Sequence, residues 1–216
     1  MKFRIVIIVL IAMLVGSQVY VLNVVSDLTN KLEVKNKFDP NATSNDILLI
    51  GNSIFANCDW GKKMNMSNIF NSAVSGLTLF EANQFPSTFV NRKSKKIVIE
   101  LGINDLNTTV PTKMVVYAGV AFLGLVKKIS PNSEVYVMSV LPLNETLMKG
   151  KSSNKEISEY NFKISSWAKN NHMQYIDAYS VLLDERGQLN QLYTIDGLHL
   201  NEIGYSKLAS VLKPYF

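Results

Sequence analysis

The feature that most constrains this chain is an apolar run that ends in a short polar turn, from Asp46 to Ser53. Four aliphatic residues, Ile47 to Ile50, follow one another without alternation, which is typical of a strand buried on both faces of a parallel sheet. Gly51 then allows a sharp turn, so we expect Ser53 just beyond the carboxyl end of a central strand, where open α/β sheets bind ligands. Gly-Asn-Ser is also ordinary turn chemistry, so the rest of the chain must decide between a turn and a site.

Predicted strands and helices alternate along the rest of the chain. Strands are expected over 68–74, 96–101, 134–141 and 174–177, and helices over 77–90, 112–129, 157–170 and after 201. Residues 54–60 are expected to form a loop or short helix, and Pro86 should end or kink the helix over 77–90. The alternation predicts an α/β fold with a central parallel sheet and helices on both faces, a three-layer α/β/α sandwich.

Composition limits the class of protein. The chain has 216 residues, of which 47% are hydrophobic, enough for one sizeable core and short for two. Its formal charge is +5, and the 20 basic and 17 acidic residues that follow residue 25 give +3. This excess is mild and no Lys/Arg cluster carries interleaved aromatic residues, so no nucleic-acid partner is expected. Oligomeric state is not defined by the sequence.

The cysteine and histidine content does not indicate a metal site. Cys58 is the sole cysteine, so it cannot form an internal disulfide, and no Cys/His set has zinc-ligand spacing. Cys58 could be a nucleophile, but a lone cysteine is more often inert packing. His172 is interpreted as a surface residue. Neither a metal nor an organic cofactor is expected.

The first 25 residues carry a targeting pattern. Lys2 and Arg4 precede an uncharged, largely apolar segment from Ile5 to Val25. About 20 apolar residues span a bilayer as a helix, and the basic pair would keep the N-terminus in the cytoplasm. We expect an uncleaved anchor (1–25), and a signal peptide cleaved after Ser17 is the alternative. Residues 26–45 then form a linker, and a catalytic domain over 46–216 lies outside the cytoplasm, membrane-anchored or secreted.

Two further strand ends carry residues suited to bind a ligand. Ser75-Gly76 closes the second predicted strand, and glycine lets its backbone N–H approach a ligand without a Cβ in the way. Asn104 follows the third strand, where its side-chain NH₂ could donate a hydrogen bond. Asn104 could instead form an Asx-turn with its own backbone. Both positions should lie at the same edge of the sheet as Ser53.

The segment before the last predicted helix holds a carboxylate and an imidazole close together. Asp196 and His199 are separated by Gly-Leu, so the carboxylate can reach imidazole Nδ1 while Nε2 points elsewhere. Asn201 is expected to be the N-cap of the helix, with Leu200 and Tyr205 in hydrophobic-staple positions. His199 would therefore lie on a loop that a helix braces, as a catalytic base requires.

Four blocks, taken in chain order, resemble those of the SGNH hydrolases, the GDSL-type esterase and lipase superfamily. The blocks are Ile50-Gly-Asn-Ser-Ile54, Ser75-Gly76, Gly102-Ile-Asn-Asp105 and Asp196-Gly-Leu-His199. The likeness runs from about residue 46 to residue 216. One departure is Asn52, which stands where the family most often has Asp, but the family's triad acid is the Asp before the His.

The resemblance implies a flavodoxin-like fold and a serine-hydrolase site. Ser53 would be the nucleophile, His199 the general base and Asp196 the residue that orients the imidazole. The oxyanion hole would consist of the backbone N–H groups of Ser53 and Gly76 and the side chain of Asn104.

Three functional classes follow from this set of residues. A serine esterase would hydrolyse an O-acetyl group on a glycan or another small ester, an O-acyltransferase would pass the acyl group to a sugar hydroxyl, and a non-catalytic binding module would keep the blocks only as turns. The intact set of residues disfavours the third class, because a binding module does not need it. The sequence does not separate the first two, since a fold and a triad define a reaction class but not an acceptor.

Overall fold

The computed structural model describes residues 46–86, 90 and 94–216. All of them belong to one compact unit, Pro40–Phe216. The predicted membrane segment (1–25) and linker (26–45) lie outside the described residues. Within the described part of the chain, no helix has both the length and the apolar character needed to cross a membrane.

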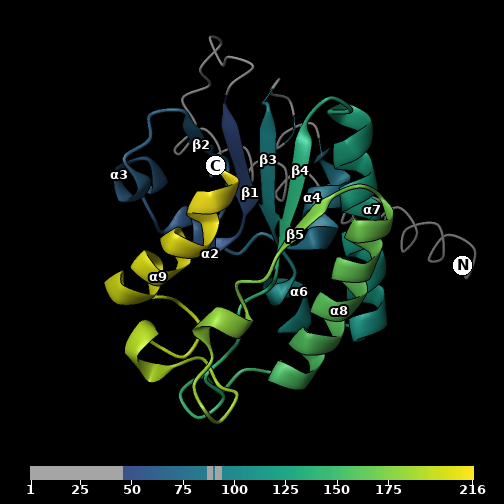
Figure 1. The fold of residues 1–216 in the computed structure, drawn as a ribbon. Coiled ribbons are helices and arrows are strands. Elements are labelled where there is room, and N and C mark those ends of the chain that lie inside the picture. The colour runs from purple at the N-terminus through teal and green to yellow at the C-terminus, as the bar shows by residue number, and fades with distance from the viewer. Residues whose placement is uncertain (1–45, 87–89, 91–93) are drawn as a thin grey trace, which may run out of the picture. The chain divides into compact units, whose positions relative to one another are not determined.

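A five-stranded, fully parallel sheet forms the centre of the fold (Figure 1). Its strands are β1 (Ile47–Gly51), β2 (Ile69–Asn71), β3 (Lys96–Glu100), β4 (Glu134–Met138) and β5 (Gln174–Ile176). They lie in the order β2-β1-β3-β4-β5, which is the flavodoxin-like order, with the ligand site at the carboxyl ends of the strands around the first strand. Every residue of β1 is buried, so the prediction of a central strand from the apolar run is confirmed.

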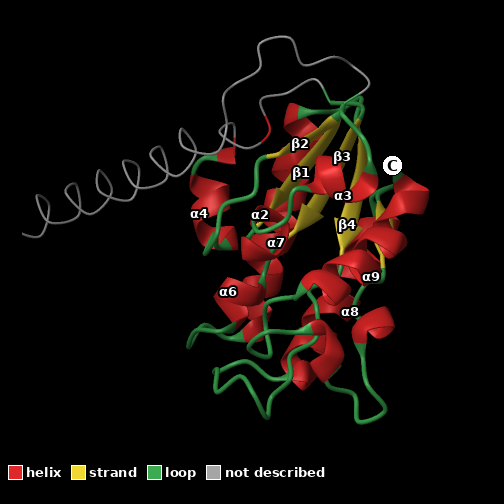
Figure 2. Cartoon of the chain, turned by 90° about the vertical axis from the view of Figure 1, so that its left-hand side faces the viewer, coloured by secondary structure: helices red, strands yellow, loops and turns green. Residues whose placement is uncertain are grey.

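Helices cover both faces of the sheet, which confirms the predicted three-layer arrangement. In Figure 1, α3 (Trp60–Met64) and α9 (Glu202–Leu212) lie on one side, and α7 (Thr112–Ile129) and α8 (Asn154–Asn170) lie on the other. Shorter α-helices in the described part of the chain include α2 (Ser53–Ala56), α4 (Leu79–Gln84) and α6 (Ile103–Leu106). Figure 2 shows the loops gathered at the edge toward which the strands point, with α6 beside them.

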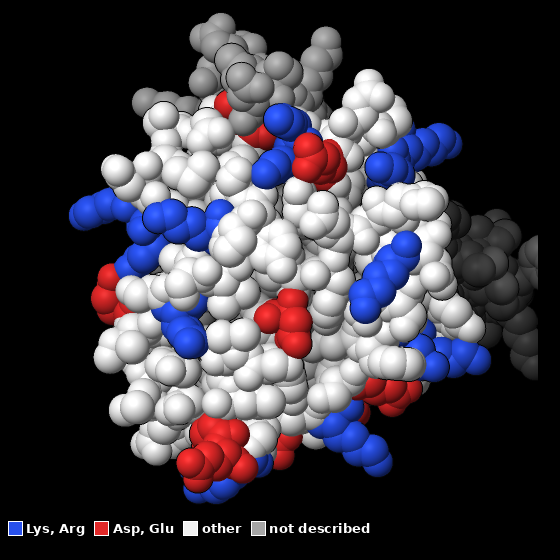
Figure 3. Space-filling view, viewed as in Figure 1, with Lys and Arg blue, Asp and Glu red and all other residues white. Residues whose placement is uncertain are grey.

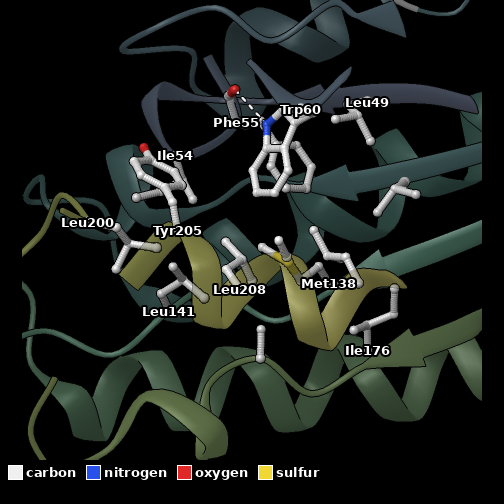
Figure 4. Close-up of a cluster of buried hydrophobic side chains, with 14 of the residues drawn as sticks. Leu49, Ile54, Phe55, Trp60, Met138, Leu141, Ile176, Leu200, Tyr205 and Leu208 are labelled. Carbon is white, nitrogen blue, oxygen red and sulfur yellow. Dashed lines mark hydrogen bonds between the residues drawn. The ribbon is translucent and has the colours of Figure 1, made fainter. Parts of the chain in front are cut away.

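One hydrophobic cluster joins α9 to the turn that follows β1 (Figure 4). Trp60 packs edge-to-face on Phe55, with ring centroids 5.5 Å apart, and on Tyr205, at 6.0 Å. Each such aromatic pair contributes roughly 0.5–1.5 kcal/mol beyond its buried area. The Trp60 indole N–H also donates to the Phe55 carbonyl oxygen at 2.9 Å. The start of α9 and the segment after Ser53 are therefore fixed to one common core.

The predicted start of α9 is confirmed in detail. Asn201 is its N-cap, and its side-chain oxygen accepts from the backbone N–H of Gly204 at 3.0 Å. The two staple residues, Leu200 and Tyr205, are both buried in the cluster of Figure 4. This cap fixes the entry of the chain into α9, and the segment just before it carries His199.

Two helix boundaries differ from prediction because side chains cap them. α8 begins at Asn154, not Ile157, because Ser153 and Glu156 form a capping box. Thr78 and Glu81 form another box that starts α4 at Leu79. α4 ends at Gln84, close to Pro86, as expected. The predicted strands were too long at their ends.

The charged side chains drawn in Figure 3 do not form a single-sign stripe on that face. Basic and acidic residues are interspersed there on a largely uncharged surface. Such mixing produces no strong field of one sign over the described part of this face.

Candidate active site

Ser53 directly follows the tight turn between β1 and α2. Asn52 is the N-cap of α2, and its side-chain oxygen accepts from the Ile54 backbone N–H at 2.9 Å. A Cβ at Gly51 would lie 2.8 Å from a ring carbon of Phe55 and 3.0 Å from the Glu100 carbonyl oxygen, so glycine is needed for this close approach. Ser53 is the first residue of α2, where a backbone N–H has no partner within the helix.

Ser53, His199 and Asp196 form one hydrogen-bonded chain. Ser53 Oγ lies 3.1 Å from His199 Nε2, and His199 Nδ1 lies 2.7 Å from Asp196 Oδ2. The carboxylate therefore favours the tautomer with its proton on Nδ1, which leaves Nε2 free to accept the Ser53 hydroxyl proton. The structure brings together these three residues, which the sequence analysis assigned from two segments 143 positions apart.

The Asp196 carboxylate is kept in its charged form. Partial burial raises the pKa of Asp196, but hydrogen bonds from the His199 side chain and from the backbone N–H groups of His199 and Leu198 outweigh burial and hold the pKa below its usual value. Asp196 Oδ1 accepts from these two backbone groups at 2.7 and 3.0 Å. The carboxylate is thus preorganised as a hydrogen-bond acceptor for the imidazole.

The loop that carries Asp196 and His199 is held by hydrogen bonds within the loop and by one from a neighbouring segment. Thr194 Oγ1 donates to the His199 carbonyl oxygen and accepts from the Gly197 N–H, both at 2.8 Å. From outside the loop, the Asn144 N–H donates to the Gly197 carbonyl oxygen at 2.8 Å. The roles of Thr194 and Asn144 were not predicted from the sequence. A Ser/Thr two residues before the Asp could have indicated the first, whereas no local pattern indicates the second.

Gly76 and Asn104 lie on adjacent loops at the same edge of the sheet. Gly76 lies after β2, and the segment between them is tied to β1 by the hydrogen bond from the Val74 N–H to the Gly51 carbonyl oxygen at 2.9 Å. The Asn104 NH₂ group donates to the Leu77 carbonyl oxygen at 2.9 Å, which leaves its second N–H for a ligand. Their roles as oxyanion donors stay predictions.

Gly76 is needed for a different reason from the one expected. Its φ is +82°, and a Cβ built there meets no atom within 4 Å. The glycine is therefore required by the left-handed backbone conformation, and the space beside it is open.

Asp105 is a positioning residue that the sequence analysis missed. Its carboxylate accepts from the Leu79 N–H at 2.8 and 3.0 Å, and it is buried. Burial raises the pKa of Asp105 to about 6, and hydrogen bonds from backbone N–H groups only partly offset this effect. Asp105 joins the loop of Asn104 to the start of α4, just after Gly76, so it helps to fix the separation of the two predicted oxyanion donors.

Cys58 and His172 lie outside the site geometry. Cys58 is half-buried, and burial raises the pKa of its thiol to about 11, so it remains a protonated thiol at neutral pH and is a poor nucleophile. His172 is exposed at the end of α8 with a φ of +57°, which confirms its interpretation as a surface residue.

Comparison with known protein families agrees with this arrangement. A sequence model of the GDSL-like Lipase/Acylhydrolase family matches residues 49–207, a range that includes both Ser53 and His199. The chain belongs to this family. The resemblance inferred from the four blocks is therefore confirmed, and the protein is a hydrolase of the GDSL-like lipase/acylhydrolase class.

Solved structures share the fold of this acylhydrolase over most of its length. A Streptococcus pneumonia protein described as a candidate platelet activating factor is 26% identical, with a TM-score of 0.80 over 94% of this chain and 98% of its own. A GDSL-like lipase from Bacteroides thetaiotaomicron is 20% identical, with a TM-score of 0.73 over 87% of this chain and 96% of its own. The second likeness shows the fold alone.

One curated relative is a longer protein. The N-acylneuraminate cytidylyltransferase of Escherichia coli O18:K1:H7 is 28% identical over 179 residues, which cover 82% of this chain. The chain spans 41% of the length of that enzyme.

Proposed function

We propose that this acylhydrolase cleaves a carboxylic ester through a covalent acyl-enzyme formed on Ser53. The observation that carries the proposal is the continuous chain of contacts from Ser53 Oγ to His199, at 3.1 Å, and from His199 to Asp196, at 2.7 Å. A nucleophile within hydrogen-bond reach of a base, which a third group orients, is the arrangement that activates a serine hydroxyl.

The reaction has two halves. In the first, Ser53 Oγ attacks the ester carbonyl carbon while His199 Nε2 takes the hydroxyl proton, and the same proton then passes to the departing alcohol oxygen. In the second, His199 takes a proton from water, the resulting hydroxide attacks the acyl carbon, and the proton returns to Ser53 as the acid leaves. Asp196 stabilises the imidazolium in both halves.

The oxyanion formed in each half is assigned to three donors, the backbone N–H groups of Ser53 and Gly76 and the side chain of Asn104. The open space at Gly76 and the second N–H of Asn104 support this assignment. The loss of one such donor typically lowers turnover by about 10²–10³.

A small acyl group on a polar alcohol, such as an O-acetyl sugar, is the proposed substrate class. A polar hollow of about 420 Å³ is lined by Asn57, Cys58, Asp59, Lys62, Lys63, Glu202 and Tyr205. Its link to the nucleophile is Asn57, whose backbone N–H donates to the Ser53 carbonyl oxygen at 3.0 Å, and Ser53 itself does not line it. The name of the longer relative, N-acylneuraminate cytidylyltransferase, refers to a sugar acid, and this likeness supports a sugar as the alcohol part of the substrate.

The test is hydrolysis by the full-length chain of acetylated sugars and of nitrophenyl esters with acetyl and longer acyl groups. We expect a preference for acetyl esters, and Ser53→Ala and His199→Ala should each abolish turnover, with losses that do not add in the double variant. Acetyl transfer to an added sugar at the expense of hydrolysis would support the acyltransferase alternative. Normal turnover by the Ser53→Ala variant would overturn the proposed function.

The proposed location is outside the cytoplasm, and it rests on Lys2, Arg4 and the apolar segment that follows them. The full-length chain should fractionate with membranes, and protease added on the extracytoplasmic side should digest its domain. A soluble mature form that begins near Gln18 would identify a cleaved signal peptide. Protection of the domain inside the cytoplasm would contradict both versions.

A further inference from the structure

Glu100 is a buried carboxyl group beneath the turn that presents Ser53. It is the last residue of β3, its side chain is fully buried, and it pairs in register with Gly51 of β1. Gly51 is two residues before Ser53, and a Cβ there would lie only 3.0 Å from the Glu100 carbonyl oxygen. The backbone of Glu100 therefore packs directly against the residue at the base of the turn.

The surroundings of this carboxyl group contain no compensating charge. Neither carboxyl oxygen of Glu100 has a hydrogen-bond partner among the described protein groups, and the Asn52 side-chain nitrogen also has none. The Asn52 amide nevertheless interacts with the Glu100 carboxyl, so the two groups are neighbours without a hydrogen bond of normal geometry.

The titratable groups that face Glu100 from the packed helices are both tyrosines. They are Tyr160 of α8, whose hydroxyl donates to the Leu101 carbonyl oxygen at 3.0 Å, and Tyr205 of α9. Among the described residues, no lysine or arginine is recorded as acting on the Glu100 carboxyl. A buried carboxylate without a cation or donors is costly, so the uncharged acid is the stable form. In agreement, burial raises the pKa of Glu100 to about 8, with a smaller opposing effect of the Asn52 amide.

We propose that Glu100 is a positioning residue: as a buried, uncharged acid it holds the Asn52 side chain and, through it, the turn that presents Ser53. Asn52 can serve both sides, because its oxygen accepts from the Ile54 N–H, while its side-chain nitrogen is buried without a hydrogen-bond partner among the described groups and lies near enough to act on the Glu100 carboxyl. The inference rests on the proposed serine mechanism. It also gives the Asn52 side chain a partner that N-capping of α2 alone does not require.

This placement predicts a loss of activity at alkaline pH. When Glu100 ionises, an uncompensated negative charge appears in the strand paired with Gly51, two residues before Ser53, and this charge opposes the oxyanion that develops in the reaction. Cys58 does not explain a transition near pH 8, because burial raises the pKa of its thiol to about 11. Burial also raises the pKa values of Tyr160 and Tyr205, which moves their ionisation further from this pH range.

The test is the pH profile of kcat and KM for the full chain and the Glu100→Gln variant on one acetyl ester. The wild type should lose about tenfold in kcat between pH 7.5 and 9.5, with little change in KM. Glu100→Gln is uncharged at every pH, so it should keep kcat within about threefold of wild type at pH 7 and lack the alkaline loss. The control is Asp46→Asn, which removes a buried acid at the other end of β1 and should keep the wild-type profile.

Three outcomes would overturn the inference: an unchanged alkaline loss in Glu100→Gln, a flat wild-type profile, or a folded Glu100→Gln variant that is inactive at pH 7. If Glu100→Gln does not fold, Asn52→Asp gives a second test. A carboxylate at position 52 would hold the proton on Glu100 more strongly, so the alkaline loss should move to higher pH, and an unmoved loss would count against the proposal. Activity in Ser53→Ala would instead show that the serine mechanism itself is wrong.

Discussion

Gly197 lies between Asp196 and His199, the two proposed triad residues of the last loop, and its replacement by alanine should displace that loop. Its φ is +91°, and a Cβ there would lie 2.8 Å from both the Asn144 carbonyl oxygen and the Met148 backbone nitrogen. These are backbone atoms that cannot rotate away. We expect about 1–2 kcal/mol of conformational strain and about 1–3 kcal/mol of overpacking, a total of roughly 2–5 kcal/mol in the free energy of unfolding.

Gly187 provides a matched control for this substitution. Its φ is +72°, but a Cβ built there meets no atom within 4 Å. Gly187→Ala should therefore cost only the strain, about 1–2 kcal/mol, and leave the site unchanged.

The assay combines urea unfolding with kcat/KM on one acetyl ester. A displacement of the catalytic loop by about 1 Å would lower kcat/KM roughly 10²-fold in Gly197→Ala, whereas Gly187→Ala should stay within about twofold of wild type. Equal stability and equal activity in the two variants would refute the conclusion that contact with the Asn144 loop positions the triad.

Three other substitutions test the supporting residues. Asp196→Asn should fold but lose up to about 10⁴ in turnover, because an amide favours the wrong imidazole tautomer. Asn52→Asp should be tolerated within about tenfold, or ~1.4 kcal/mol, at neutral pH, because aspartate can also cap α2. Circular dichroism and kcat/KM check both, and an active Asp196→Asn beside an inactive Asn52→Asp would reverse these roles. Asp105→Asn tests stability. Folding raises the pKa of Asp105 from 3.8 to about 6. The folded state therefore binds the Asp105 proton more tightly than the unfolded state does. The free energy of unfolding of the wild type should fall by about 3 kcal/mol as the pH rises from 3.8 to about 6. Urea unfolding of Asp105→Asn should not show this decrease.

The sequence predicted those structural features that depend on residues close together in the chain. The unbroken apolar run of β1, the cap at Asn201 and the staple of Leu200 and Tyr205 each follow from short-range patterns, and each is confirmed. The capping box at Ser153 is equally local, and it starts α8 at Asn154, three residues before the predicted start.

Contacts between distant segments could not be predicted in the same way. The support of Gly197 by Asn144 and the burial of Glu100 beneath the Ser53 turn depend on how loops and strands meet in space. Asp105 was visible in the third block, but its contact with the start of α4 joins residues 26 positions apart. Such residues have no periodic or spacing pattern that indicates their role.

The central claim is that Ser53 is a nucleophile activated by His199, and covalent labelling tests it most directly. The full-length protein should react with a fluorophosphonate probe, and peptide mass spectrometry should find the adduct on Ser53. Ser53→Ala should show no adduct, and His199→Ala, if folded, should react at least about 10²-fold more slowly because its serine has no base. An adduct on another residue, or equal labelling of wild type and Ser53→Ala, would contradict the claim.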